Sequence, residues 1–251
     1  MPQRLIPQEN LPAGDAGSPL AGKTALVTGA SRGIGRVIAL RLAELGARLL
    51  LVARDPAALA EVKQSIIHLA TAADALTCDL ASAPEIADLA AHIEEAGGCD
   101  ILINAAGIGK IGAPLHQMPI EDFDAILATN LRAPFLLMRA VVPYMIARGG
   151  GEIVNISSLA GQGPLANGAA YSASKWALNG LSYSAAEELR AHNIRVSVVA
   201  PGSVNTSFGR GGKDRTKMLQ PEDVAGVVAM LVTQPPQSFI SEVRMRPTQK
   251  P

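Results

Sequence analysis

From Lys23 onward, short apolar runs alternate with longer amphipathic segments along the whole chain. Most of the apolar runs are continuously hydrophobic, which is typical of parallel strands that are covered on both faces. Strand–helix alternation with right-handed crossovers predicts a doubly wound α/β fold, with one parallel sheet of seven strands flanked by helices in three layers. The predicted strands are 24–29, 48–53, 75–80, 100–106, 151–157, 194–202 and 239–245.

Helical periodicity marks the segments between the strands. A stripe of apolar residues runs from Ile34 to Leu45, and Gly46 is expected to end that helix. We expect Pro134 to kink or restart the helix predicted for 121–147, because proline lacks the N–H donor that a helix interior needs. The other predicted helices are 57–70, 84–97, 171–191 and 221–233.

The domain organisation predicted from these patterns is simple. No linker or repeat interrupts residues 23–246, so we predict a single Rossmann-type domain over 21–251. Residues 1–20 are rich in proline and glycine, a composition typical of a disordered arm.

Charge and composition exclude several classes of partner. Lysine plus arginine and aspartate plus glutamate both total 22, and aromatic residues make up only 3%, so neither nucleic acid nor an anionic membrane is an expected partner. No apolar run reaches the roughly 18 residues that span a bilayer, and no signal peptide is evident, so we expect a cytoplasmic protein. Cys78 and Cys99 lie in apolar runs and are expected to be buried thiols. The histidines are scattered, and no metal site is predicted.

A glycine-rich turn, "TGASRGIG", joins the first predicted strand to the first helix. Glycine has no Cβ, so the backbone can turn tightly and approach a pyrophosphate, while the helix N-terminus supplies N–H donors. A purely structural turn is the alternative, but the strand–turn–helix context favours a dinucleotide site. The cofactor contacts predicted here are Gly29, Ser31, Arg32, Gly33, Ile34 and Gly35.

The end of the second strand bears on the choice of cofactor. An NAD site would place an acidic residue there, whereas this chain has Arg54, with Arg32 in the glycine turn. Two guanidinium groups suit a 2′-phosphate, so NADP(H) is favoured. Asp55 keeps NAD(H) open, because its carboxylate could reach the ribose hydroxyls instead.

Two further strands end in residues that suit a bound nucleotide. Asp79, followed by Leu80, could accept a hydrogen bond from an adenine amino group, and the small residues of "NAAG" would let a flat ring approach the backbone. A plain strand-to-loop turn explains either feature equally well. The predicted contacts in this second motif are Asn104, Ala105, Ala106 and Gly107.

Tyr171 and Lys175 lie four residues apart in a run of small residues, so they share one face of a helix. A free phenol has a pKa of about 10 and is a poor acid–base group at neutral pH. We expect the lysine ammonium to lower the pKa of the phenol, and the strand "GEIVNISS" to bring Ser158 to the same edge of the sheet. An exposed tyrosine with its lysine in solvent is the alternative.

In combination, "TGASRGIG", "NAAG", "TNLRAPF", "ISS", "YSASK" and "PGSVNT" resemble the motifs of the short-chain dehydrogenase/reductase superfamily, over nearly all of residues 23–246. The resemblance implies that Ser158 binds the substrate oxygen and that Tyr171 transfers a proton to or from it. It implies that Lys175 lowers the pKa of the tyrosine and binds the nicotinamide ribose, and that Asn130 holds a water linking that lysine to solvent. The residues that resemble the family's nicotinamide-binding segment are Pro201, Gly202, Val204 and Thr206.

Substrate identity is expected to reside in the loops after Ser158 and after the sixth strand. The predicted substrate contacts are Ser158, Leu159, Gln162, Leu165, Tyr171 and Phe208. The glycine-rich, basic segment 207–218 could receive an acidic or phosphorylated carrier, although a solvated loop explains it as well. The chain looks most similar to 3-oxoacyl-(acyl-carrier-protein) reductases, but its polar C-terminal end departs from their pattern.

Three functions stay open at this point. The first is an NADP(H)-dependent reductase that converts a ketone or 3-oxoacyl-type carbonyl to a hydroxyl. The second is an NAD-dependent alcohol or hydroxy-compound dehydrogenase, and the third is a non-catalytic dinucleotide-binding regulator. The resemblance also implies a homodimer or homotetramer that pairs through the segments 121–147 and 171–191.

Overall fold

The computed structural model describes residues 17–69, 71–208 and 214–251. These residues form a seven-stranded sheet in the order β3-β2-β1-β4-β5-β6-β7, and every neighbouring pair is parallel. The predicted doubly wound α/β fold is therefore confirmed. The strands are β1 (Thr24–Thr28), β2 (Arg48–Ala53), β3 (Ala73–Thr77), β4 (Ile101–Asn104), β5 (Gly151–Ile156), β6 (Ile194–Pro201) and β7 (Glu242–Met245).

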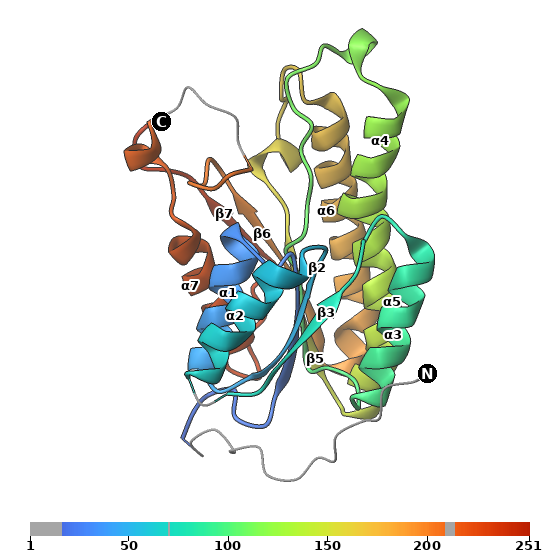
Figure 1. Cartoon of the computed structure of the whole chain (residues 1–251), viewed down its shortest axis with the longest axis vertical. Helices are drawn as coiled ribbons and strands as arrows, with labels where there is room; N and C mark the ends of the chain where they lie inside the picture. The colour runs from blue at the N-terminus through green and yellow to red at the C-terminus, as the bar shows by residue number, and fades with distance from the viewer. Residues whose placement is uncertain (1–16, 70, 209–213) are drawn as a thin grey trace.

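Helices cover both faces of the sheet, which gives the three layers. Figure 1 shows α1, α2 and α7 on one side of the strands and α3 to α6 on the other. The helices are α1 (Gly33–Glu44), α2 (Pro56–Ile67), α3 (Ala83–Glu95), α4 (Ile120–Leu127), α5 (Ala133–Ala147), α6 (Ala169–Leu189) and α7 (Pro221–Val232). The order of the strands reverses direction between β1 and β4, and doubly wound folds bind ligands outside the carboxyl ends of the strands at such a point.

The predicted strand boundaries are least accurate where burial is incomplete. The central strand β2 is buried along almost all its length, and its bounds were predicted correctly. The edge strands β3 and β7 are partly exposed; β3 begins two residues before the predicted segment 75–80, and β7 begins three residues after the start of the predicted segment 239–245. β3 ends at Thr77, because only Ala73 to Thr77 pair with β2, and Asp79 and Leu80 lie in the turn that follows. An edge strand has one neighbour and one solvent-facing side, so its apolar pattern is weak.

The segment 121–147 is not one uniform helix. α4 and α5 are joined by a π-helical turn, η2 (Ala128–Arg132), and Pro134 lies in the first turn of α5. The prediction that Pro134 restarts the helix is confirmed. Single π turns of this kind are frequent at functional sites, and this one carries Asn130.

By length and composition alone, the continuous helical stretch Ile120–Ala147, with 28 residues, could cross a membrane. The core helix of a globular domain meets the same criteria. In this structure Leu137, Val141 and Met145 are buried in the core on one face of the sheet. The packing is that of a core helix.

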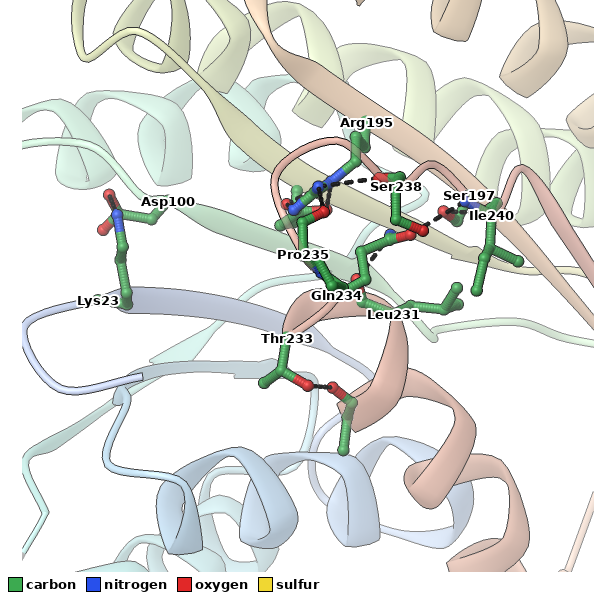
Figure 2. A network of polar contacts seen from close by, with 12 residues as sticks. Lys23, Asp100, Arg195, Ser197, Leu231, Thr233, Gln234, Pro235, Ser238 and Ile240 are labelled. Atoms are coloured by element: carbon green, nitrogen blue, oxygen red, sulfur yellow. Dashed lines mark hydrogen bonds and ion pairs between the residues drawn. The ribbon is translucent and has the colours of Figure 1, made fainter. Parts of the chain in front are cut away.

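At the end of the sheet where β5 and β6 begin, a polar network around Arg195 on β6 fixes the loop before β7. Arg195 forms an ion pair with Glu152 on β5 and donates to the carbonyl oxygens of Pro235 (3.1 Å) and Ser238 (3.0 Å). Figure 2 shows these bonds, which fasten the loop that leads into β7. Ser197 adds a bond to the carbonyl oxygen of Ile240 at 2.7 Å. The last strand is therefore held in register although only one neighbour pairs with it.

Two predictions about single segments can be compared with the structure. Cys78 and Cys99 are free, buried thiols, as predicted. Most of the predicted N-terminal arm lies outside the described residues, but Leu20 is buried and donates its backbone N–H to the carbonyl oxygen of Leu45. The packed domain therefore begins within the stretch predicted as an arm.

Candidate active site

The turn between β1 and α1 requires glycine at two positions. Gly29 has a φ of +68°, and a Cβ there would lie 2.9 Å from the Cα atom of Ala106. A Cβ on Gly35 would collide with the carbonyl oxygen of Gly29. Within the described part of the chain, no side chain caps the start of α1 and its first turn holds no acidic residue. The N–H donors that a helix start leaves without intrahelical partners therefore suit an anion, and the turn fits a nucleotide pyrophosphate.

Thr28, which the sequence did not single out, holds the neighbouring strand end against this turn. Its hydroxyl accepts hydrogen bonds from the backbone N–H groups of Ala105 (3.0 Å) and Ala106 (3.1 Å). The same hydroxyl donates to the carbonyl oxygen of Ile103 (3.3 Å). These bonds end β4 two residues earlier than predicted, because the two alanine N–H groups donate to a side chain and not to the backbone of a neighbouring strand. The only signal in the sequence is a polar residue at the end of an apolar strand.

The residues predicted to select the cofactor lie at the same edge. Arg32 and Arg54 are exposed, so both guanidinium groups are accessible to a ligand. Asp55 is the N-cap of α2, and its Oδ1 accepts from the backbone N–H groups of Ala57 and Ala58, both at 3.1 Å. The Asp55 carboxylate, which could have bound the ribose hydroxyls of NAD, thus already accepts hydrogen bonds through Oδ1 from its own helix.

Three predicted cofactor contacts have their side chains engaged elsewhere. The Leu80 side chain is packed in the core, and Asp79 accepts from the backbone N–H of Ala81 at 3.0 Å. Asn104 is 3% exposed and donates to Asn155 Oδ1 at 2.8 Å, between β4 and β5. Contacts of Leu80 and Asn104 with a nucleotide would therefore have to come from their backbones.

Ser158, Tyr171 and Lys175 converge where β5 meets α6. The Ser158 side chain lies close enough to the Tyr171 phenol to oppose the rise in its pKa. Lys175 is 4% exposed, and its Nζ donates to the carbonyl oxygen of Ile156 at 2.8 Å and lies 5.9 Å from the centroid of the Tyr171 ring. The alternative of an exposed tyrosine with a solvated lysine is excluded, since both side chains are buried.

Asn130 reaches the same place from the π turn. Its Oδ1 accepts from the backbone N–H of Ile108 and its Nδ2 donates to the carbonyl oxygen of Ile108, both at 2.9 Å, and Nδ2 also reaches Ser174 Oγ at 3.0 Å. A Cβ on Gly107 would lie 3.4 Å from Asn130 Oδ1 and 3.8 Å from Lys175 Nζ, so Gly107 lies between the two side chains. The four predicted catalytic residues are therefore brought together.

Burial controls the acid–base properties of the pair. Burial raises the pKa of the Tyr171 phenol, and the hydrogen bond with Ser158 opposes this rise. Burial also lowers the pKa of Lys175 to about 8. The expected lowering of the phenol pKa by the lysine is therefore wrong for the protein groups alone, because desolvation of the phenol raises its pKa and the opposing contribution comes from Ser158.

The segment after β6 packs beside the glycine turn. Pro201 ends β6, and Gly202 donates its N–H to the carbonyl oxygen of Met245 at 2.9 Å. The methyl group of Thr206 lies 3.6 Å from the position that a Cβ on Gly33 would take. Val204 forms a β-bridge with Leu219, which holds this segment in place.

Among the predicted substrate contacts, Phe208 lies against Tyr171 and Leu159 follows Ser158 directly, whereas the Gln162 side chain is engaged elsewhere. The Gln162 amide donates to Glu242 on β7, and Glu242 also accepts from the Tyr183 hydroxyl at 3.0 Å. The prediction that Gln162 lines the substrate site is not supported by this geometry, because its side chain anchors the loop that carries Ser158. Its partner is 80 residues away, so no local sequence signal could have shown the contact.

Helix α6 holds the other side of that loop. Ser172 Oγ donates to the carbonyl oxygen of Ala160 at 2.7 Å, and Asn179 Nδ2 donates to that of Gly161 at 2.9 Å. A Cβ on Gly161 would lie 2.9 Å from the backbone of Lys175, so loop and helix are in tight contact. Ser158 is thus fixed between α6 and β7.

The fold and the grouping of Asn130, Ser158, Tyr171 and Lys175 define a dinucleotide-dependent oxidoreductase of the doubly wound α/β class. Residues 23–216 match the family of short chain dehydrogenases, and the chain belongs to that family. It is an NAD(P)-dependent dehydrogenase/reductase.

Three similar proteins show that the similarity extends over most of the chain. The chain is 52% identical to a metagenomic short-chain oxidoreductase solved in complex with NADP, with a TM-score of 0.84, covering 93% of this chain and 100% of that one. It is 31% identical to a 3-oxoacyl (acyl-carrier-protein) reductase from Agrobacterium tumefaciens C58 with NADP bound, with a TM-score of 0.83 and coverage of 92% and 95%. Human dehydrogenase/reductase SDR family member 4 is 34% identical over 230 residues, or 86% of this chain and 83% of the relative.

The Gln162–Glu242 pair yields a charge-swap test. Gln162→Glu places two carboxylates against each other, so we expect the loop to shift Ser158 and kcat to fall roughly tenfold or more, because small displacements of a catalytic group are costly. The double variant Gln162→Glu/Glu242→Gln restores an acid–amide pair and should recover most of kcat. Steady-state kinetics, with cofactor affinity measured separately, check both.

Glu222→Gln is the matched control, since Glu222 is an exposed carboxylate in the first turn of α7. Unchanged kcat in Gln162→Glu, or a double variant no better than the single one, would show that the pair does not position Ser158.

Proposed function

We propose that the protein is an NADP(H)-dependent reductase that converts the carbonyl of a ketone or 3-oxoacyl-type substrate to a hydroxyl. The observation that carries the proposal is that the Ser158 and Tyr171 side chains meet beside the buried Lys175 ammonium. Two hydroxyl groups at one point can hold a single substrate oxygen, and one of them can give it a proton.

The cofactor, when bound, supplies the hydride that reduces the carbonyl carbon. Ser158 and Tyr171 orient the carbonyl oxygen, and Tyr171 donates its phenolic proton to that oxygen. The Tyr171 phenol is protonated at neutral pH, because its ordinary pKa of about 10 is raised further by burial, and the Lys175 ammonium beside it favours release of the proton to the substrate oxygen. The Lys175 ammonium then stabilises the phenolate that remains, and it is the residue expected to bind the ribose hydroxyls. Asn130 keeps the backbone of Ile108 in place beside this group.

Arg32 and Arg54 support NADP(H) over NAD(H). Both are exposed at the edge where the glycine turn lies, and Asp55 is occupied in capping α2. A 2′-phosphate accepts charge-assisted hydrogen bonds from guanidinium groups, whereas a ribose hydroxyl gains less from them. The NADP bound in two similar structures supports the same choice.

A ketone panel followed at the NADPH absorbance tests the proposed function. Wild type should oxidise NADPH with at least one ketone or 3-oxoacyl thioester, and Tyr171→Phe should lower kcat by about 100-fold to 10,000-fold while still binding NADPH, because the general acid is lost. Arg54→Ala should raise the KM for NADPH about tenfold or more and leave that for NADH unchanged, because a charge-assisted bond is worth about 1.5–3 kcal/mol.

Arg139→Ala, at an exposed position on α5, is the matched control for the loss of a guanidinium group. A preference for NADH would favour the NAD-dependent dehydrogenase instead. NADPH binding without turnover across the panel would contradict the proposal and favour a regulator.

We also propose that the protein acts in the cytoplasm as a homodimer or homotetramer on a small or carrier-bound substrate. A groove of about 790 Å³ between α4, η2 and α6 is lined by Leu127, Leu131, Phe135 and Leu181, and Phe135 is 47% exposed. Apolar helix faces of this kind suit a second copy of the same chain.

Light scattering on the eluting protein tests the assembly. We expect twice or four times the 26.0 kDa mass of one chain, and a smaller mass for Phe135→Asp, because the substitution would bury a charge in the interface. A single-chain mass for wild type would contradict the assembly.

A further inference from the structure

The ring of Phe208 lies against the catalytic tyrosine. The centroids of the Phe208 and Tyr171 rings are 5.7 Å apart, with the ring planes tilted by 52°. The edge of the Phe208 ring also lies 3.0 Å from the position that a Cβ on Gly109 would take. Phe208 therefore spans from the tyrosine to the segment after β4, and it is still 47% exposed. An aromatic side chain in this position has one face on the protein and area left for a ligand.

Two aliphatic side chains extend this surface. Ile111 Cδ1 lies 3.4 Å from the Cβ position of Gly109, and its Cγ2 lies 3.5 Å from that of Gly168. Leu165 Cδ2 lies 2.6 Å from the same point on Gly168. Ile111, Leu165 and Phe208 follow β4, β5 and β6 respectively, so side chains from three strand ends form a continuous surface that meets the tyrosine at Phe208; together they are called the apolar wall.

Among the described residues close in sequence to the apolar wall, two ion pairs are found. Lys110, next to Ile111, forms an ion pair with Asp122 Oδ1 at 3.1 Å. Asp214 accepts from Thr216 Oγ1 at 2.6 Å and pairs with Lys217 at 3.3 Å. A substrate with many hydroxyl groups would have to place them against aliphatic and aromatic carbon, where the lost hydrogen bonds to water are not replaced.

We propose that the substrate is a ketone whose larger substituent is an alkyl chain or an aryl ring, and that sugars and other polyols are excluded. The inference rests on the proposed carbonyl-reductase function, which it makes more specific. The carbonyl oxygen is bound by Ser158 and Tyr171, and the substituent covers the apolar wall. The gain comes from apolar area removed from water, and it grows with the length of the substituent.

Paired substrates test the inference with wild-type enzyme and NADPH. We expect kcat/KM for 2-octanone and acetophenone to exceed that for fructose and dihydroxyacetone by about tenfold or more, since apolar contacts of this size discriminate at that level. Faster reduction of fructose than of 2-octanone would overturn the inference and leave the proposed function standing. If no ketone is reduced although NADPH binds, the proposed function fails and the inference fails with it.

Variants at Phe208 locate the effect on the apolar wall. Phe208→Ala should raise the KM for acetophenone about tenfold with a smaller change in kcat, and Phe208→Leu should recover part of the loss. Phe239→Ala, a similarly exposed phenylalanine in the loop before β7, should leave both parameters unchanged. NADPH binding, followed by fluorescence, confirms that each variant is folded. An unchanged KM in a folded Phe208→Ala would show that the substituent lies elsewhere and would overturn the inference.

Discussion

The burial of one ammonium group organises this site. Lys175 is 4% exposed, and the carbonyl oxygen of Ile156 accepts a hydrogen bond from its Nζ. Removing an ammonium from water disfavours its charged form, and the pKa of Lys175 is accordingly lowered to about 8. The small residues of α6 permit this burial, because Ser174 and Ser182 are fully covered and let the helix lie close to the sheet. A positive charge is thereby held beside a protonated phenol before any substrate arrives.

The rest of the site is built where parallel strands end, and each end is fixed by a side chain from another element. Thr28 on β1 binds the alanines after β4, and Asn130 in the π turn binds Ile108 a few residues further on. The loop with Ser158 is tied to α6 and, through Gln162 and Glu242, to β7. Because these bonds come from neighbouring elements, the positions of the side chains in the site do not depend on the stiffness of the loops. Positioning a substrate requires side chains that are fixed in this way.

Much of this could be read from the sequence, because it depends on local pattern. Continuous apolar runs predicted the buried strands, and glycines and a Tyr–Lys pair predicted which strand ends form the candidate site. The orientation of Gln162 could not be predicted, since Glu242 is distant in the chain and meets it only through the fold. The pKa of Tyr171 was expected to fall, but it rises, because burial depends on how closely α6 packs on the sheet. The edge strands β3 and β7 were predicted too long, since half-exposed strands carry a weak apolar signal.

Titration of the Lys175 side chain tests the central claim most directly. In protein carrying lysine labelled with ¹³C at Cε, the resonance that disappears in Lys175→Met identifies the residue, and its shift can be followed by NMR from about pH 6 to about pH 12, a range that brackets both midpoints in question. The account predicts a midpoint near 8 for Lys175. Exposed lysines should titrate at about 10.4. A Lys175 midpoint equal to that of the exposed lysines would contradict the account, because the ammonium would then not be held in a desolvated site beside the tyrosine.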